Sequence, residues 1–165
     1  MIALLTMDPS HFLAAHADEI IEGAMTALSK RHLEHYQRLG REAAVGKLRA
    51  LLDLVIDGAG TRDLVPILAY AEKIGNERYR SGFDFVEVQS AFNLLEESIW
   101  QSMLAGYPPA EQGAALGIVA TLFGAAKDKL ASTYLSLVTE THVPSLDLAS
   151  LFKGTQNTGG GAQGS

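Results

Sequence analysis

The feature that most constrains the fold is a pair of helical segments separated by a short break, over about residues 68–104. The first segment ends at Gly82, and glycine stops a helix readily because it accepts the left-handed backbone conformation. Asp84 follows, a residue type that caps the free amide groups at a helix start. Apolar residues such as Phe92 and Leu95 then recur at three- and four-residue steps. This spacing is typical of an amphipathic helix, so the segment predicts a helical hairpin on which other helices pack.

The rest of the chain shows the same helical periodicity, without the alternating apolar pattern of a strand. We expect five long helices joined by short loops, which favour antiparallel neighbours. The predicted helices cover about residues 9–39, 41–56, 63–80, 84–104 and 109–141, with a break over residues 57–61. The predicted fold class is therefore all-α, an antiparallel helical bundle in a domain of residues 1–143. Residues 144–165 are predicted to form a short amphipathic segment and a flexible Gly-rich tail.

Composition narrows the classes of function. The 165 residues include no cysteine, which excludes disulfides and thiolate chemistry. The formal net charge of -6 opposes binding to nucleic acid or to an anionic membrane surface. The longest uncharged run, residues 112–126, is shorter than the ~20 residues that cross a bilayer, and the N-terminus lacks the features of a signal peptide. We therefore expect a cytoplasmic protein with no nucleic-acid partner and no membrane insertion.

Few side chains suggest chemistry. His32 and His35 are three residues apart, a spacing that could place two imidazoles on one metal ion, but neither has the glutamate three positions before it that di-iron helical bundles require. Glu96 and Glu97 are adjacent carboxylates, which are more often solvated on a helix surface than catalytic. The chain has no nucleophile elbow and no Gly-rich phosphate loop. We predict a non-enzymatic protein without metal or cofactor, and keep a haem or small ligand inside the bundle as an alternative.

Four residues of the hairpin are candidates for a structural switch. Arg78, if semi-buried, needs Glu87 or a helix C-terminus as its partner, and an ion-pair latch is the favoured interpretation. Gly82 would be the hinge. Asn93 lies in the apolar middle of the fourth predicted helix, where a buried amide could fix register or oligomeric state. An exposed position for Asn93 at the rim is equally consistent with the sequence.

Two further regions are candidates for contact with a partner. The last predicted helix has many small residues in its first half, and small residues let another helix approach closely. The candidates for a dimer seam are this small-residue face, with Gly113, Gly117 and Gly124, or the face of the fourth predicted helix around Asn93 and Trp100. The C-terminal segment could dock in a groove of a larger assembly or fold back on its own bundle. Its predicted anchors are Leu146, Leu148, Leu151 and Phe152.

Several segments of the hairpin match the pattern of a known family: residues 70–74, 77–79, 82–84 and 88–100. Through these segments, and through His35-Tyr36 ahead of the helix at residues 51–55, the chain resembles the RsbRD N-terminal domain family over about residues 20–138. The resemblance implies a helical sensory or regulatory input module that often precedes an output domain in bacterial stress-signalling proteins and has no known catalytic role. Little sequence follows residue 138, so we expect no output domain here and expect the module to act through a partner.

These observations predict a bacterial sensory or regulatory module that acts through protein–protein interaction as a homodimer. Its partner would be a signalling protein or a larger assembly that the sequence does not identify. One alternative is a cargo or adaptor protein that is recruited through its C-terminal peptide. The other is a sensor that binds a small ligand or haem.

Overall fold

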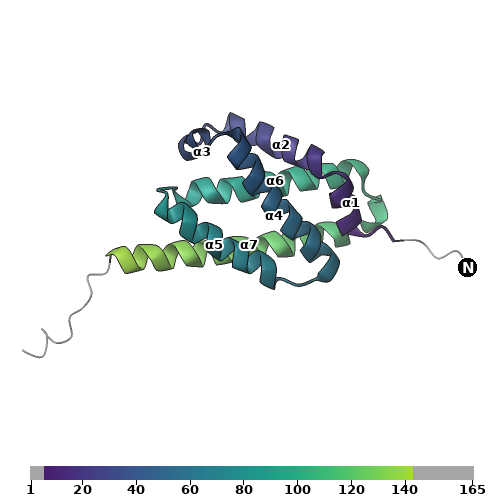
Figure 1. The fold of residues 1–165 in the computed structure, drawn as a ribbon. Coiled ribbons are helices and arrows are strands. Elements are labelled where there is room, and N and C mark those ends of the chain that lie inside the picture. The colour runs from purple at the N-terminus through teal and green to yellow at the C-terminus, as the bar shows by residue number, and fades with distance from the viewer. Residues whose placement is uncertain (1–5, 143–165) are drawn as a thin grey trace, which may run out of the picture.

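The computed structural model describes residues 6–142, and this range contains helices and no strand (Figure 1). The predicted all-α class is therefore confirmed. The helices are α1 (Pro9–Ala15), α2 (Ala17–Lys30), α3 (Glu34–Leu39), α4 (Arg41–Thr61), α5 (Val65–Arg80), α6 (Phe85–Gly106), the 3-10 helix η1 (Pro109–Glu111) and α7 (Gln112–His142).

The first predicted helix is not continuous, and the prediction of one helix over residues 9–39 was wrong. The chain turns at His16, between α1 and α2, and again at His32, whose φ of 50° lies in the left-handed region. These turns let α1 pack on α4 while α2 packs on α6. One straight helix of this length would extend ~46 Å and could not cover both neighbours. Periodicity did not reveal the turns because each short helix has its own apolar face.

The predicted break over residues 57–61 was also wrong, because α4 continues to Thr61 and ends at Arg62, with φ at 63°. Gly58 is buried inside the helix, and a Cβ added there would lie 2.6 Å from Cδ2 of Leu122 on α7. Glycine at this position therefore permits close helix packing and does not stop the helix.

The turn between α5 and α6 forms where the sequence predicted it, but α5 packs mainly on α7, and α6 on α2 and α7, rather than on each other. Gly82 has a φ of 83°, and the amide of Phe83 donates to the carbonyl oxygen of Arg78 at 3.0 Å. Asp84 caps α6, and Glu87 completes a capping box with it. The glycine and the aspartate therefore perform the local roles that their residue types favour.

The core lies where α6 and α7 meet the other helices. The helix α5 packs on α7, α2 packs on α6, and α4 contacts α2, α5, α6 and α7; Figure 1 shows α4 crossing between α2 and α6 on one side and α5 and α7 on the other. Leu52, Val55, Leu95, Ile99 and Phe123 are fully buried in this core. Among the described helices, none is both long enough and apolar enough to span a membrane.

Candidate functional site

The α5–α6 turn places a buried arginine among aromatic rings. Arg78 lies in the last turn of α5 and is only 6% exposed. Its guanidinium carbon is 4.6 Å from the ring centroid of Phe83 and 5.5 Å from that of Tyr36. A cation over an aromatic face is attracted by the ring quadrupole. The ring of Phe83 also meets that of Tyr36 edge to face, with centroids 5.1 Å apart.

The carboxylate of Glu87 interacts with a histidine and not with this arginine. Nδ1 of His35 lies 2.6 Å from Oε2 of Glu87, and the amide of Asp84 donates to the same oxygen at 3.3 Å. Within residues 6–142, no carboxylate lies within 4.0 Å of the guanidinium of Arg78. The structure therefore does not contain the Arg78–Glu87 ion pair that the sequence suggested, because α3 brings His35 to Glu87 instead.

The two other switch candidates lie apart from each other. Gly82 occupies the turn between α5 and α6. Asn93 is exposed on α6, where its Oδ1 accepts a hydrogen bond from Nζ of Lys127 at 3.1 Å. The same ammonium lies 2.7 Å from Oε2 of Glu96. Of the two positions that the sequence allowed for Asn93, the structure shows the exposed one.

A small cavity lies beside the guanidinium of Arg78. Its volume, taken as the space open to the centre of a water molecule, is about 20 Å³. Tyr36 and Tyr70 line it, and burial raises the pKa of each phenol to about 12. The hydroxyl of Tyr70 donates to the carbonyl oxygen of Lys47 at 3.0 Å. No local pattern predicted this cavity, because its lining comes from α3, α4, α5 and α6.

Three of the four candidates for the dimer seam lie on the outer side of α7. Gly113 and Gly117 are exposed and Gly124 is half-buried, and a Cβ added at any of the three would have no neighbour within 4 Å. Trp100, on α6, is 41% exposed. It lies two helical turns after Asn93, which contacts α7, so it lies on the side of α6 nearest to α7. The structure thus brings the four candidates to adjoining helices.

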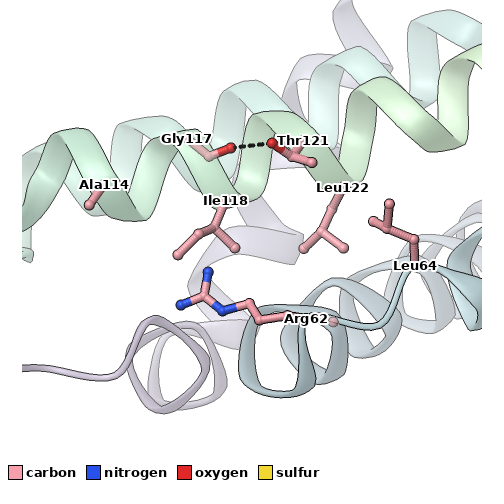
Figure 2. A pocket seen from close by; sticks show the side chains of 8 residues that line it. Arg62, Leu64, Ala114, Gly117, Ile118, Thr121 and Leu122 are labelled. Atoms are coloured by element: carbon pink, nitrogen blue, oxygen red, sulfur yellow. Dashed lines mark hydrogen bonds between the residues drawn. The ribbon is translucent and has the colours of Figure 1, made fainter.

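A groove of about 300 Å³ borders this side of α7 (Figure 2). Its wall on α7 includes Gly117, Ile118 and Thr121, and the facing wall comes from the end of α4 and from Leu64. Figure 2 shows the side chain of Arg62 extending from the end of α4 toward Ile118. Sequence reasoning missed Arg62, because neither periodicity nor a turn motif marks a left-handed arginine at a helix end.

A sequence model of the RsbT co-antagonist protein rsbRD N-terminal domain matches residues 13–143. The chain belongs to this family. The match confirms the resemblance and begins earlier than the sequence segments had suggested. RsbRD N-terminal domains are regulatory domains of stress signalling and are not a known enzyme family. No curated protein and no solved structure matches the chain.

The other candidate groups of this RsbRD N-terminal domain do not assemble into a site. His32 lies in the turn before α3, and His35 lies within α3 beside Glu87. No group of three or more potential metal-ligating side chains occurs in the described part of the chain. Glu97 is exposed. The predicted tail anchors, at positions 146, 148, 151 and 152, lie outside the described residues.

Proposed function

We propose that this RsbRD N-terminal domain is a non-enzymatic regulator that works as a homodimer in the cytoplasm and acts on a signalling protein through direct contact. Membership of a stress-signalling family supports the regulatory part. The outer face of α7 supports the homodimer. The observation that carries the proposal is the presence of three glycines on this face for which the chain's own packing gives no reason.

Glycine inside a helix has a free-energy cost. Each glycine destabilises a helix by about 1 kcal/mol relative to alanine. At Gly75 that cost has a structural reason: a Cβ there would lie 3.0 Å from Cγ2 of Thr133, so α5 and α7 could not approach as they do. At Gly113, Gly117 and Gly124 no such contact exists. A helix from outside the chain that packs closely on α7 would supply the missing reason.

The spacing along α7 fits a second helix. Gly117, Ala120 and Gly124 follow one another at steps of three and four residues, which is the spacing of a helix–helix seam. Exposed apolar side chains continue the same line toward the end of α7, with Leu135 69% exposed and Val138 39% exposed. An identical helix from a second copy would bury this line against itself, as two-fold dimers do.

The test is the mass of the full chain in solution, measured by light scattering over a range of concentrations. The wild-type chain should be a dimer. Gly117→Leu should be a monomer, because the leucine side chain would occupy the space of the second helix. Gly46→Leu is the matched control: Gly46 lies exposed within α4, and a Cβ there also has no neighbour within 4 Å. It should remain a dimer.

Circular dichroism checks that both variants keep the helical content of the wild type. A wild-type chain that stays monomeric at the highest concentration would contradict the homodimer. So would a Gly117→Leu variant that dimerises as well as Gly46→Leu, because the seam would then lie elsewhere.

A further inference from the structure

Arg78 carries a charge in a place where a charge is costly. A guanidinium that is removed from water loses hydration, and proteins normally restore the balance with a carboxylate. Arg78 is 6% exposed, and no hydrogen bond or ion pair within residues 6–142 engages its guanidinium. The faces of Phe83 and Tyr36 offset part of the cost. An anion beside the guanidinium would offset much more of the free-energy cost of burying this charge.

The neighbouring carboxylates do not serve as that anion. Glu87 is held by His35 at 2.6 Å, and Glu77 lies 3.3 Å from the ammonium of Lys47. Both are close enough to raise the pKa of a neighbouring tyrosine, Glu87 that of Tyr36 and Glu77 that of Tyr70, although burial is the main cause in each case. Each is thus near the cavity but bound to another side chain.

The cavity beside Arg78 has the lining that a carboxylate with a hydrocarbon chain requires. Its volume exceeds the ~10–15 Å³ that one water-sized group needs. Besides the guanidinium, Tyr36 offers a hydroxyl that engages no partner among the described residues, while the hydroxyl of Tyr70 is already used. The remaining lining is largely apolar and includes Leu48, Leu51, Ile74, Val88, Ala91 and Phe92. We propose that this cavity binds a short-chain monocarboxylate, whose carboxylate accepts hydrogen bonds from Arg78 and Tyr36.

A route to the cavity leads past α3. Tyr36 and Ala44 line both the cavity and an outer groove of about 290 Å³, so these two side chains form a wall that the two spaces share. The short helix α3 that carries Tyr36 lies between two residues with positive φ, His32 at 50° and Gly40 at 88°. A small rotation of α3 would join the groove to the cavity. The combined space is near the ~300 Å³ at which small-molecule sites begin, so the hydrocarbon chain would extend into the groove.

The experiment is isothermal titration calorimetry of the full chain with butyrate. Butyramide is the neutral control of the same shape, and chloride is the control for a simple anion. Butyrate should bind one molecule per chain, and butyramide should bind at least about tenfold more weakly because it lacks the charge that pairs with Arg78. Chloride should not compete with butyrate at equal concentration.

Three variants locate the site. Arg78→Gln should lose butyrate binding, whereas Arg49→Gln, at a surface arginine paired with Asp18, should bind like the wild type. Because Arg78→Gln removes a buried side chain and could unfold the protein, Ala44→Met provides a second test: its longer side chain fills the opening between cavity and groove and should abolish binding with Arg78 in place. Circular dichroism establishes that each variant is folded.

The proposal is overturned if butyrate fails to bind the wild-type chain at millimolar concentration, or if chloride displaces it at equal concentration. Equal butyrate affinity in the wild type and in folded Ala44→Met would also overturn it. The site lies within one chain and does not depend on the homodimer. Light scattering on the same samples distinguishes the failure of the butyrate site from the failure of the homodimer, because a monomer that binds butyrate refutes only the homodimer.

Discussion

At the contact between α2 and α6, a buried hydrogen bond lies beside a glycine, and together they predict how substitutions there change the free energy of unfolding. Ser98 is buried on α6, and its hydroxyl donates to the carbonyl oxygen of Ile20 on α2 at 2.7 Å. Gly23 lies one turn further along α2. A Cβ added at Gly23 would lie 2.6 Å from Oγ of Ser98 but 3.8 Å from its Cβ. The hydroxyl is therefore the atom that requires glycine at position 23.

The free energies of three variants follow from this geometry. Gly23→Ala gains about 1 kcal/mol of helix propensity. It loses ~1–3 kcal/mol from overpacking and a further ~0.5–1.5 kcal/mol if the hydroxyl of Ser98 is pushed off its acceptor. We expect a net destabilisation of about 2 kcal/mol. Ser98→Ala alone should cost about 1 kcal/mol for the lost hydrogen bond.

In the double variant Gly23→Ala/Ser98→Ala the clash disappears, because the remaining Cβ atoms make an ordinary contact. The helix propensity gained at position 23 then offsets the hydrogen bond lost at position 98, so the stability should match the wild type. The coupling free energy of the cycle is thus about 3 kcal/mol, at the upper end of values for residues in contact.

The assay is urea unfolding of the four proteins, followed by circular dichroism. Gly46→Ala, at an exposed helical glycine with no neighbour within 4 Å, measures helix propensity alone and should stabilise the chain by about 1 kcal/mol. If the effects at positions 23 and 98 are additive, so that Gly23→Ala costs the same with and without the serine hydroxyl, the close approach of α2 to α6 at this point is refuted.

Two further predictions concern buried polar groups. Burial raises the pKa of Tyr36 and Tyr70 to about 12, so the folded chain keeps protons that the unfolded chain loses near pH 10, and stability should fall as the pH rises from 10 to 12. In a spectrophotometric titration, Tyr36→Phe should lose one late-ionising phenolate, and an unaltered late phase would show that Tyr36 is not buried. Lys127→Met should lower the free energy of unfolding by about 1 kcal/mol, because the half-buried ammonium is 2.7 Å from Glu96 and 3.1 Å from Asn93. An unchanged urea midpoint would contradict this.

The parts of the fold that the sequence predicted depend on local chemistry. Gly82 and Asp84 mark the end of one helix and the start of the next, and each acts through its own backbone conformation or side chain within a few residues. Gly58 shows the limit of this reasoning. It looks like a helix stop within Asp57-Gly58-Ala59-Gly60, yet its role is to admit Leu122 from a helix far along the chain. Local patterns do not distinguish a glycine that ends a helix from one that admits a neighbour.

The candidate site was only partly predictable for a similar reason. The sequence singled out Arg78 and Glu87, and both do lie at the α5–α6 turn. The partner of Glu87 is His35, 52 residues away, which reaches it only because the chain turns at His32 and starts a new helix. A pattern that predicts a single helix there cannot place His35 at the turn, nor Tyr36 beside Arg78.

The α5–α6 turn also connects the cavity to the helix that carries the proposed seam. The ring of Phe83 packs against both Arg78 and Tyr36, while its carbonyl oxygen accepts a hydrogen bond from the hydroxyl of Tyr134 on α7 at 3.0 Å. The ring of Tyr134 is in turn packed against that of Phe85, at 5.6 Å between centroids. A ligand that moves Tyr36 must therefore either break the edge contact between Tyr36 and Phe83 or move Phe83 as well. Moving Phe83 would disturb the hydrogen bond that its carbonyl oxygen accepts from Tyr134 on α7. Coupling between two binding events is reciprocal. If a ligand changes the dimerisation constant by some factor through this turn, its own affinities for the dimer and for the monomer must therefore differ by that same factor.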